Sequence, residues 1–315
     1  MATVSVIMPA FNVAPYIGAS IESVIAQTAP DWELLIVDDG STDTTAQSVE
    51  AYAAKDPRVR LIRQVNRGIS AARNRALRES TGAFIATLDS DDIWEPNFLE
   101  VQLAIFARRP EVDVVTGNGW FLGGRWHGSP ARPYPDPRPQ PTLATMLSDE
   151  TAIFIMSVMR RRVYSAVGEF DETLITNEDY DFWLRAAAAG FTFVRNDEPL
   201  GHYRRRSDSM SANHVRMVTG ILQVYDKMRS ILIGRPNELR IMEEQVARFQ
   251  RARLTAEALD ALNAGDGHLA ADHLDALYAQ EGRPIVKVAG FMARWMPRLL
   301  SRAYQLRRAR QEGAS

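Results

Sequence analysis

The sequence predicts an α/β protein with a Rossmann-like, nucleotide-binding sheet and a C-terminal helical extension. Over the first 115 residues, short apolar runs alternate with segments of helical periodicity, which is typical of βαβ units in a parallel sheet. Acidic residues follow two of these runs directly, at the expected carboxyl ends of strands, where ligands of such sheets bind. From about residue 215 onward, the pattern is almost wholly helical.

The N-terminal half supplies most of the predicted sheet. Strands are expected at five short apolar runs bounded by turn-forming residues, namely 4–8, 33–37, 59–63, 83–88 and 112–116. Helices are expected in the periodic segments between them, near 15–28, 43–54, 69–80 and 96–108.

The chain then changes character. Residues 117–141 contain repeated glycines and prolines that interrupt regular elements, so we expect a long surface loop there. An apolar run at 153–159 follows, and then a short helix at 160–167. A further helix is expected from 177 to about 189, and residues 239–280 predict a helical hairpin.

Composition excludes several classes of protein. With 46% hydrophobic and 24% charged residues, the chain can bury a core and is neither disordered nor low-complexity. It contains no cysteine, which excludes disulfide scaffolds, thiolate zinc sites and cysteine nucleophiles. No apolar run approaches the ~18 residues of a membrane span, and the N-terminus lacks the basic region of a secretory signal. We therefore expect a cytoplasmic protein, with the inner face of the membrane as an alternative location.

The strongest chemical signal is the segment Leu88-Asp89-Ser90-Asp91-Asp92, which places three carboxylates directly after a predicted strand. Like charges this close repel, and a divalent cation commonly holds them together. Oxygen ligands suit Mg²⁺ or Mn²⁺. The alternative is that Asp91 or Asp92 caps the helix that follows.

A second acidic segment, residues 37–43, also follows a predicted strand. Because carboxyl ends of parallel strands share one edge of the sheet, both acidic segments are expected there. Asp38 or Asp39 would accept hydrogen bonds from a nucleobase or a ribose. The alternative, that Thr42 or Asp43 caps a helix and Gly40 forms a turn, explains only part of this segment.

A third signal is the segment 66–74, in which Gly68 leads into a helix and Arg73 follows one turn later. An anion would bind the helix start and the arginine. The alternative is that Arg73 lies on a solvated helix face.

These segments, with residues 4–12 and the pair Glu178-Asp179, occur in an order that resembles the family 2 glycosyltransferases of the GT-A fold. The resemblance covers roughly residues 3–210. It implies a GT-A domain at 1–214, with a nucleotide-binding half at 3–116 and an acceptor-side half at 117–214. Residues 215–315 would then form the helical extension.

The resemblance also implies residue roles. Asp179 would be the catalytic base with Glu178 beside it, and Asp91 with Asp89 would hold the metal. The implied nucleotide-binding residues are Pro9, Ala10, Asn12, Asp38, Asp39, Gly68, Arg73, Asp89 and Ser90.

Residues 203–211 resemble the family segment that closes over the donor diphosphate, which implies that Arg204 and Arg206 bind the phosphates. Many relatives have histidine where Arg206 stands, in some cases as a metal ligand. The third protein ligand is therefore open, and either Arg206 meets the phosphates directly or His202 substitutes from nearby.

The predicted function is a metal-dependent inverting glycosyltransferase that uses a nucleotide-diphosphate sugar, with UDP as the expected nucleotide. A carboxylate base and a Lewis-acid metal meet the two needs of the transfer, removal of the acceptor proton and departure of the diphosphate. The acceptor would be a saccharide or a lipid-linked precursor in polysaccharide or glycolipid assembly. The alternative is a catalytically degenerate GT-A scaffold that binds a partner. A dehydrogenase is disfavoured because no G-x-G-x-x-G follows the first strand.

The C-terminal residues 283–312 are strongly basic, whereas the rest of the chain is acidic. This asymmetry argues against nucleic-acid binding by the body and predicts an anionic partner for the tail. Apolar residues recur there every three or four positions, so a basic amphipathic helix would contact an anionic membrane, with Pro297 as a kink. The alternative is that the apolar stripe packs on the catalytic domain or on a second subunit in a homo-oligomer.

Overall fold

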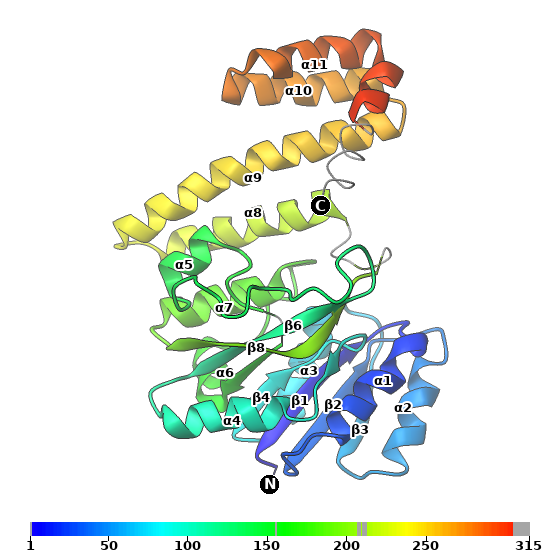
Figure 1. Cartoon of the computed structure of the whole chain (residues 1–315), viewed down its shortest axis with the longest axis vertical. Coiled ribbons are helices and arrows are strands. Elements are labelled where there is room, and N and C mark those ends of the chain that lie inside the picture. Colours follow the sequence, from blue (N-terminus) through cyan, green and yellow to red (C-terminus); the bar gives the residue numbers. More distant parts are fainter. Residues whose placement is uncertain (1, 155, 207–208, 210–212, 305–315) are drawn as a thin grey trace. The chain divides into compact units, whose positions relative to one another are not determined.

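The computed structural model describes residues 2–154, 156–206, 209 and 213–304, and every structural statement below refers to these residues. Eight strands form one sheet in the order β3-β2-β1-β4-β7-β6-β8-β5 (Figure 1). The strands are β1 (Val4–Ala10), β2 (Trp32–Asp38), β3 (Val59–Arg63), β4 (Phe84–Thr87), β5 (Ile93–Trp94), β6 (Val114–Leu122), β7 (Ser157–Arg160) and β8 (Phe193–Arg204).

The first four strands of this order, β3, β2, β1 and β4, are parallel. All seven residues of β1 are buried, as expected for a strand covered on both faces. The crossovers are α1 (Ala14–Ile25), α2 (Thr45–Ala53) and α3 (Ile69–Glu79), and α4 (Phe98–Arg108) follows β5. Figure 1 shows α1 and α2 side by side, and they pack against each other. The predicted βαβ organisation is therefore confirmed.

The other half of the sheet is mixed. Strand β7 runs antiparallel to both β4 and β6, β6 is parallel to β8, and β5 is antiparallel to β8. The sequence prediction contains neither β5 nor β8. Strand β8 lacks a regular alternation of apolar and polar residues, and its pairing with β6 includes register shifts.

The prediction of a loop beginning at residue 117 is wrong, because β6 continues to Leu122. Two glycines inside this strand mark close approaches of neighbouring backbone segments rather than a break in the strand. A Cβ atom at Gly117 would lie 2.7 Å from the carbonyl oxygen of Met156, and one at Gly119 would lie 2.8 Å from that of Gly201.

Short helices α5 (Leu143–Ser148) and α6 (Arg161–Val167) precede α7 (Glu178–Ala188). Helix α6 and helix α7 match the predicted helices, whereas α5 was not predicted. Thr142 begins α5 with a reciprocal capping box to Thr145. Asn177 adopts a left-handed conformation, with φ of 61°, immediately before α7.

The C-terminal part is helical, as predicted. Its helices are α8 (His214–Ile231), α9 (Pro236–Asn263), α10 (Gly267–Glu281) and α11 (Pro284–Trp295). The predicted hairpin corresponds to α9 and α10. Small side chains form much of the core between α10 and its neighbours, including Ala270, Ala271 and Ala293. Helix α11 ends at Trp295, and a helical conformation resumes at Pro297 as expected.

The chain divides into two compact units. The first comprises Met1–Ala212 with Asp226–Ile241, and the second comprises Asn213–Tyr225 with Met242–Ser315. Helix α8 therefore contributes its first part to one unit and its last part to the other. Among the described residues, no helix is both long and apolar enough to cross a membrane.

Candidate active site

The motifs predicted from the sequence lie at the carboxyl ends of β1, β2 and β4. Strand β1 ends at Ala10, which pairs in register with Asp38 at the end of β2. Strand β4 ends at Thr87, and the acidic segment 89–92 follows at once. Parallel strands share this edge, which is where open α/β sheets bind their ligands.

The loops after β1 and β2 are hydrogen-bonded to each other. Asn12, with φ of 50°, donates its backbone N–H to the Ser41 hydroxyl at 2.9 Å. Its side-chain oxygen accepts a bond from the Thr42 N–H at 2.8 Å. The carboxylate of Asp43 accepts bonds from the N–H groups of Ala14 and Thr45. These bonds hold the two loops together at this edge of the sheet, and Asp43 does serve the first turn of α2.

Asp39 fixes the loop that leads into α3. One carboxylate oxygen accepts bonds from the Gln64 side chain at 2.7 Å and the Arg67 N–H at 2.9 Å. The other oxygen accepts a bond from the N–H of Gly68 at 2.8 Å. Gly68 precedes α3 with φ of 93°, which only glycine adopts readily. A carboxylate can accept about four hydrogen bonds, so Asp39 retains acceptor capacity beyond these three.

Arg73 connects two acidic motifs that are far apart in the sequence. Its side chain, only 2% exposed, donates to Asp89 at 2.7 Å and also to Glu178. Burial by itself would lower the pKa of Arg73, but the carboxylates of Asp89, Glu178 and Asp179 outweigh burial and raise it. The alternative that Arg73 lies on a solvated helix face is therefore wrong.

Glu178 and Asp179 begin α7, and Glu178 shares the guanidinium group of Arg73 with Asp89. Burial raises the pKa of Glu178 to about 7, since the opposing effect of Arg73 is smaller and Asp179 adds to the increase. Burial also raises the pKa of Asp179, again against the effect of Arg73. Glu178 and Asp179 are therefore poised to hold a proton, which suits acid–base chemistry.

The Asp89–Asp92 segment is tied to the end of β8. Asp92, fully buried, accepts a bond from the Arg204 N–H at 2.8 Å, and the Arg204 side chain donates to the Asp91 carbonyl at 2.8 Å. Arg206 forms an ion pair with Asp91 at 3.2 Å. Burial, reinforced by Asp89, raises the pKa values of both Asp91 and Asp92. The alternative that Asp91 or Asp92 caps α4 is wrong, because no side chain caps that helix.

Tyr16 is a member of this site that the sequence did not indicate. The guanidinium groups of Arg204 and Arg206 lie 4.9 Å and 4.6 Å from the centre of its ring. A tyrosine in an amphipathic helix carries no sequence signal of such a role. His202, considered as a substitute ligand, instead bonds Glu95 at 2.7 Å.

Ion pairs between Lys227 and two aspartates also fix helix α7, and the sequence did not indicate them. Lys227 of α8 lies 2.6 Å from Asp181 of α7 and 2.5 Å from Asp171. Asp181 is buried and also pairs with Arg185 at 2.8 Å. These contacts fix the helix whose first turn contains Glu178 and Asp179.

The predicted site residues thus fall into two linked groups. Arg73 joins Asp89 to the Glu178–Asp179 turn, and the same Asp89–Asp92 segment joins Asp91 to Arg204 and Arg206. The remaining predicted residues lie along the strand ends and loops described above, with Pro9 inside β1 and with Ser90 accepting a bond from the Ser20 hydroxyl at 3.0 Å. Among the described residues, no group of three His, Asp or Glu side chains gathers as a complete metal site.

Solved structures with a similar overall fold include proteins in complex with sugar nucleotides. S. aureus TarS 1-349 in complex with UDP-GlcNAc superposes with a TM-score of 0.67 at 19% identity, over 97% of this chain and 92% of that one. The mannosyltransferase PcManGT from Pyrobaculum calidifontis, in complex with GDP-Man and Mn²⁺, gives 0.60 at 22% identity, over 96% and 87%. The fold is therefore the GT-A glycosyltransferase fold, with a helical C-terminal part.

Sequence comparison narrows this class to one family. Residues 5–168 match the profile of glycosyl transferase family 2. The chain therefore belongs to glycosyl transferase family 2, as the order of its motifs predicted.

Two relatives have names that state an activity. The chain is 35% identical over 187 residues, 58% of its length, to the Escherichia coli UDP-Glc:alpha-D-GlcNAc-diphosphoundecaprenol beta-1,3-glucosyltransferase WfgD, and covers 68% of that protein. It is 32% identical over 196 residues, 59% of its length, to the Escherichia coli chondroitin synthase, of which it covers only 27%.

Proposed function

We propose that this glycosyltransferase moves a sugar from a UDP-sugar to an acceptor hydroxyl with inversion at the anomeric carbon, in polysaccharide or glycolipid assembly. One observation supports this above the others. The buried guanidinium of Arg73 binds Asp89, from the donor-side motif, and Glu178, the neighbour of the proposed base. This contact supports a shared site for the proposed donor-side and acceptor-side groups.

Asp179 is the proposed base. An acceptor hydroxyl would give its proton to this carboxylate as the oxygen attacks the anomeric carbon and the diphosphate leaves. Burial and the nearby carboxylates raise the pKa of Asp179, which strengthens it as a proton acceptor. Glu178, held by Arg73, would keep the turn and its charge in place. A single displacement with one base would invert the anomeric centre.

The donor nucleotide would lie along the carboxyl ends of β1, β2 and β4. Asp39 and Asp38 would accept bonds from the base, Asp89 and Ser90 would lie at the ribose, and Arg204 with Arg206 would bind the diphosphate. Pro9, Ala10, Asn12 and Gly68 would provide the backbone around the nucleotide. The existing hydrogen bonds of Asn12 and Asp39 support this because they order both loops in advance.

The residues present fit a divalent cation, Mn²⁺ or Mg²⁺. Such an ion is commonly held by one or two carboxylates together with substrate phosphates, so a complete three-residue protein site is not required. Asp91, with Asp89, would supply the carboxylates. The carboxylates of Asp89, Asp91 and Asp92 repel one another in this buried segment, which supports a cation among them. When bound, the ion would offset negative charge on the departing diphosphate.

The decisive variant is Asp179→Asn, which keeps the size of the side chain but cannot accept the proton. We expect transfer to be lost by a factor of ~10²–10⁴, the usual contribution of a general base, while nucleotide affinity stays within a few-fold. Activity would be followed as UDP release in the presence of acceptor, after thermal stabilisation by a panel of sugar nucleotides with Mn²⁺ has identified the donor.

Near-normal turnover of Asp179→Asn would show that another residue is the base. A wild-type protein that neither binds nor hydrolyses any sugar nucleotide would instead favour the degenerate scaffold. The GT-A domain proposed at 1–214 would also need residues 226–241 of the helical extension at 215–315, because Asp226–Ile241 belongs to the same compact unit.

A further inference from the structure

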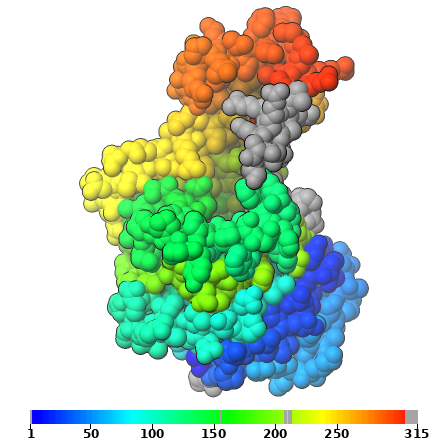
Figure 2. Space-filling view, viewed as in Figure 1, coloured from blue at the N-terminus to red at the C-terminus, as the bar shows by residue number. Residues whose placement is uncertain are grey.

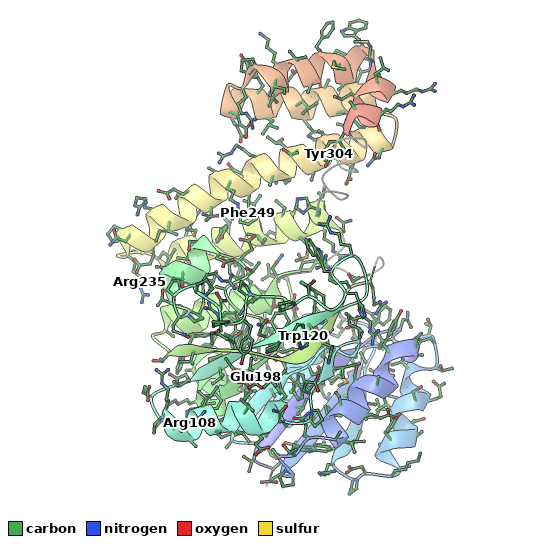
Figure 3. All side chains as sticks on the ribbon, in the orientation of Figure 1. Arg108, Trp120, Glu198, Arg235, Phe249 and Tyr304 are labelled. Carbon is green, nitrogen blue, oxygen red and sulfur yellow. The ribbon has the colours of Figure 1, made fainter. Side chains whose placement is uncertain are left out.

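Helix α11 has two apolar faces. The inner face packs on α10 and consists of three buried residues, Val286, Gly290 and Ala293. The outer face consists of four exposed apolar residues, Ile285, Val288, Phe291 and Trp295. Figure 3 shows side chains projecting from α11 on the side away from α10, and Figure 2 shows this helix in red at the surface.

The exposure of the outer face is large. Its four residues are 64%, 57%, 61% and 67% exposed in chain order. They recur at intervals of three and four, so they lie along one side of the helix. Leu299, 58% exposed, continues the apolar sequence beyond Pro297. Single exposed apolar side chains are normal, but a continuous face of them marks an interaction surface.

Exposed cations accompany this face. Lys287 precedes Phe291 by one turn, and Arg298 and Arg302 follow Trp295 in the next helical segment. Two cations also contact α10, since Arg294 pairs with Asp272 and Asp275 and the Lys287 ammonium lies 5.5 Å from the centre of the Tyr278 ring. The face therefore combines large apolar side chains, a tryptophan and flanking positive charge.

We propose that the outer face of α11, Ile285, Val288, Phe291 and Trp295, docks into the interface of a membrane that contains anionic lipid. Amphipathic helices of this kind lie in the interfacial plane, with apolar side chains in the headgroup and acyl boundary and cations at the phosphates. The inner face continues to hold α11 on α10, so docking needs no rearrangement of this helical pair. The inference is independent of the proposed reaction and would hold for an inactive chain.

The charge beside this face favours an anionic membrane over a second copy of the chain as its partner. In a symmetric pair formed through the outer face, Lys287, Arg298 and Arg302 of one copy would approach the same cations of the other. Like charges at an interface disfavour association, whereas anionic headgroups complement them. The apolar face and the cations together therefore fit a lipid surface better than a copy of themselves.

The test is cosedimentation of the full chain with vesicles of phosphatidylcholine, with or without phosphatidylglycerol. We expect binding to the phosphatidylglycerol vesicles, weaker binding in high salt, and little binding to phosphatidylcholine alone. Trp295→Asp should abolish binding. The matched control is Ile233→Asp, because Ile233 is 81% exposed in the turn between α8 and α9 and should leave binding unchanged.

A second variant changes charge and leaves the apolar face intact. Lys287→Gln combined with Arg298→Gln should weaken binding about 30-fold, equivalent to ~2 kcal/mol at ~1.4 kcal/mol per tenfold. Both side chains are exposed, so this variant should keep the wild-type thermal unfolding curve. It decides the question even if Trp295→Asp proves unstable.

Three results would overturn the proposal. The wild type could ignore vesicles of both compositions. Folded Trp295→Asp and the charge variant could bind as well as the wild type. Light scattering could show that Trp295→Asp converts an oligomer to a monomer while vesicle binding is absent, which would assign the face to a second copy.

Discussion

At the scale of single residues, Arg73 has the greatest influence on the site. It lies inside α3, yet its guanidinium group joins Asp89 to Glu178, which is 105 residues away from it in the sequence. Three carboxylates surround this one buried cation, and its removal would leave them facing each other without compensation. The acid pair at the start of α7 therefore depends on a residue of α3.

The proton of Glu178 should make stability depend on pH. Burial raises the pKa of Glu178 from 4.5 to about 7, so the folded state holds this proton more tightly than the unfolded chain does. The resulting stabilisation is fully present below about pH 4.5 and is lost as the pH rises through about 7. In Glu178→Gln, the free energy of unfolding should therefore fall less with rising pH than in the wild type.

Urea unfolding at both limits measures this difference. Glu50→Gln is the matched control, since Glu50 forms an exposed pair with Arg63, and it should follow the wild-type curve. Parallel curves for the wild type and Glu178→Gln would contradict the raised pKa.

Arg206 should compete with metal for Asp91. Arg206→Gln removes the guanidinium that pairs with this carboxylate at 3.2 Å, so Mn²⁺ affinity without nucleotide should rise several-fold. UDP affinity should fall, because a phosphate-binding cation is lost. Calorimetric titration with Mn²⁺ alone and then with UDP separates the two effects.

Arg205→Gln is the control for this experiment, because Arg205 is exposed beside Phe121 and should leave Mn²⁺ affinity unchanged. Equal Mn²⁺ affinity of Arg206→Gln and the wild type would mean that Asp91 is not the carboxylate that binds the ion.

At the scale of elements, helix α7 is positioned from outside the nucleotide-binding half. Lys227→Met should destabilise the protein by roughly 1–3 kcal/mol, because buried Asp181 loses a charged partner. Turnover should fall more than nucleotide affinity, since the base lies on α7 and most of the proposed nucleotide contacts do not. Lys227→Arg should recover part of the turnover. Thermal unfolding and a comparison of kcat with KM measure these effects.

Arg229→Met is the matched control, because Arg229 lies on the same helix and pairs at 3.6 Å with Asp226, which is 84% exposed. A fall in nucleotide affinity equal to the fall in turnover would indicate general loosening of the fold rather than positioning of α7.

Strands and motifs were predictable where the local pattern decides the structure. The buried run of β1 and the acidic segment after β4 are both evident from neighbouring residues alone. Strand β8 was not evident, because its polar stretch and Pro199 are tolerated only through irregular pairing with β6. The glycines of β6 indicated a loop, although their small size is needed for close strand contacts.

The site residues likewise divide into those that the local sequence predicts and those that it does not. The acidic motifs and Arg73 follow from local sequence and from the family resemblance. The contacts of Tyr16 with Arg204 and of Lys227 with Asp181 join distant segments, and no periodicity in the sequence encodes such a pairing. Long-range contacts of this kind depend on the complete fold.

At the scale of the whole molecule, each compact unit is built from two separate segments of the chain. Asp226–Ile241 belongs to the first unit, where Lys227 holds α7 and Arg235 donates to the Ala188 carbonyl at 2.7 Å (Figure 3). A chain cut after residue 241 should therefore bind the donor and unfold cooperatively, whereas a chain cut after residue 214 should not.

Thermal unfolding with and without donor and Mn²⁺ measures both truncations. Equal stability of the two would support a catalytic domain that ends at residue 214, and would show that the last part of α8 is dispensable.

The division of α8 between the units also constrains how the protein is made. As the nascent chain leaves the ribosome, residues 213–225 emerge before the last segment of the first unit, and their own partners from residue 242 onward emerge later still. Neither unit can therefore finish folding from one continuous stretch of newly made chain. The first unit can therefore complete its packing only after translation has passed residue 241, within the helical region.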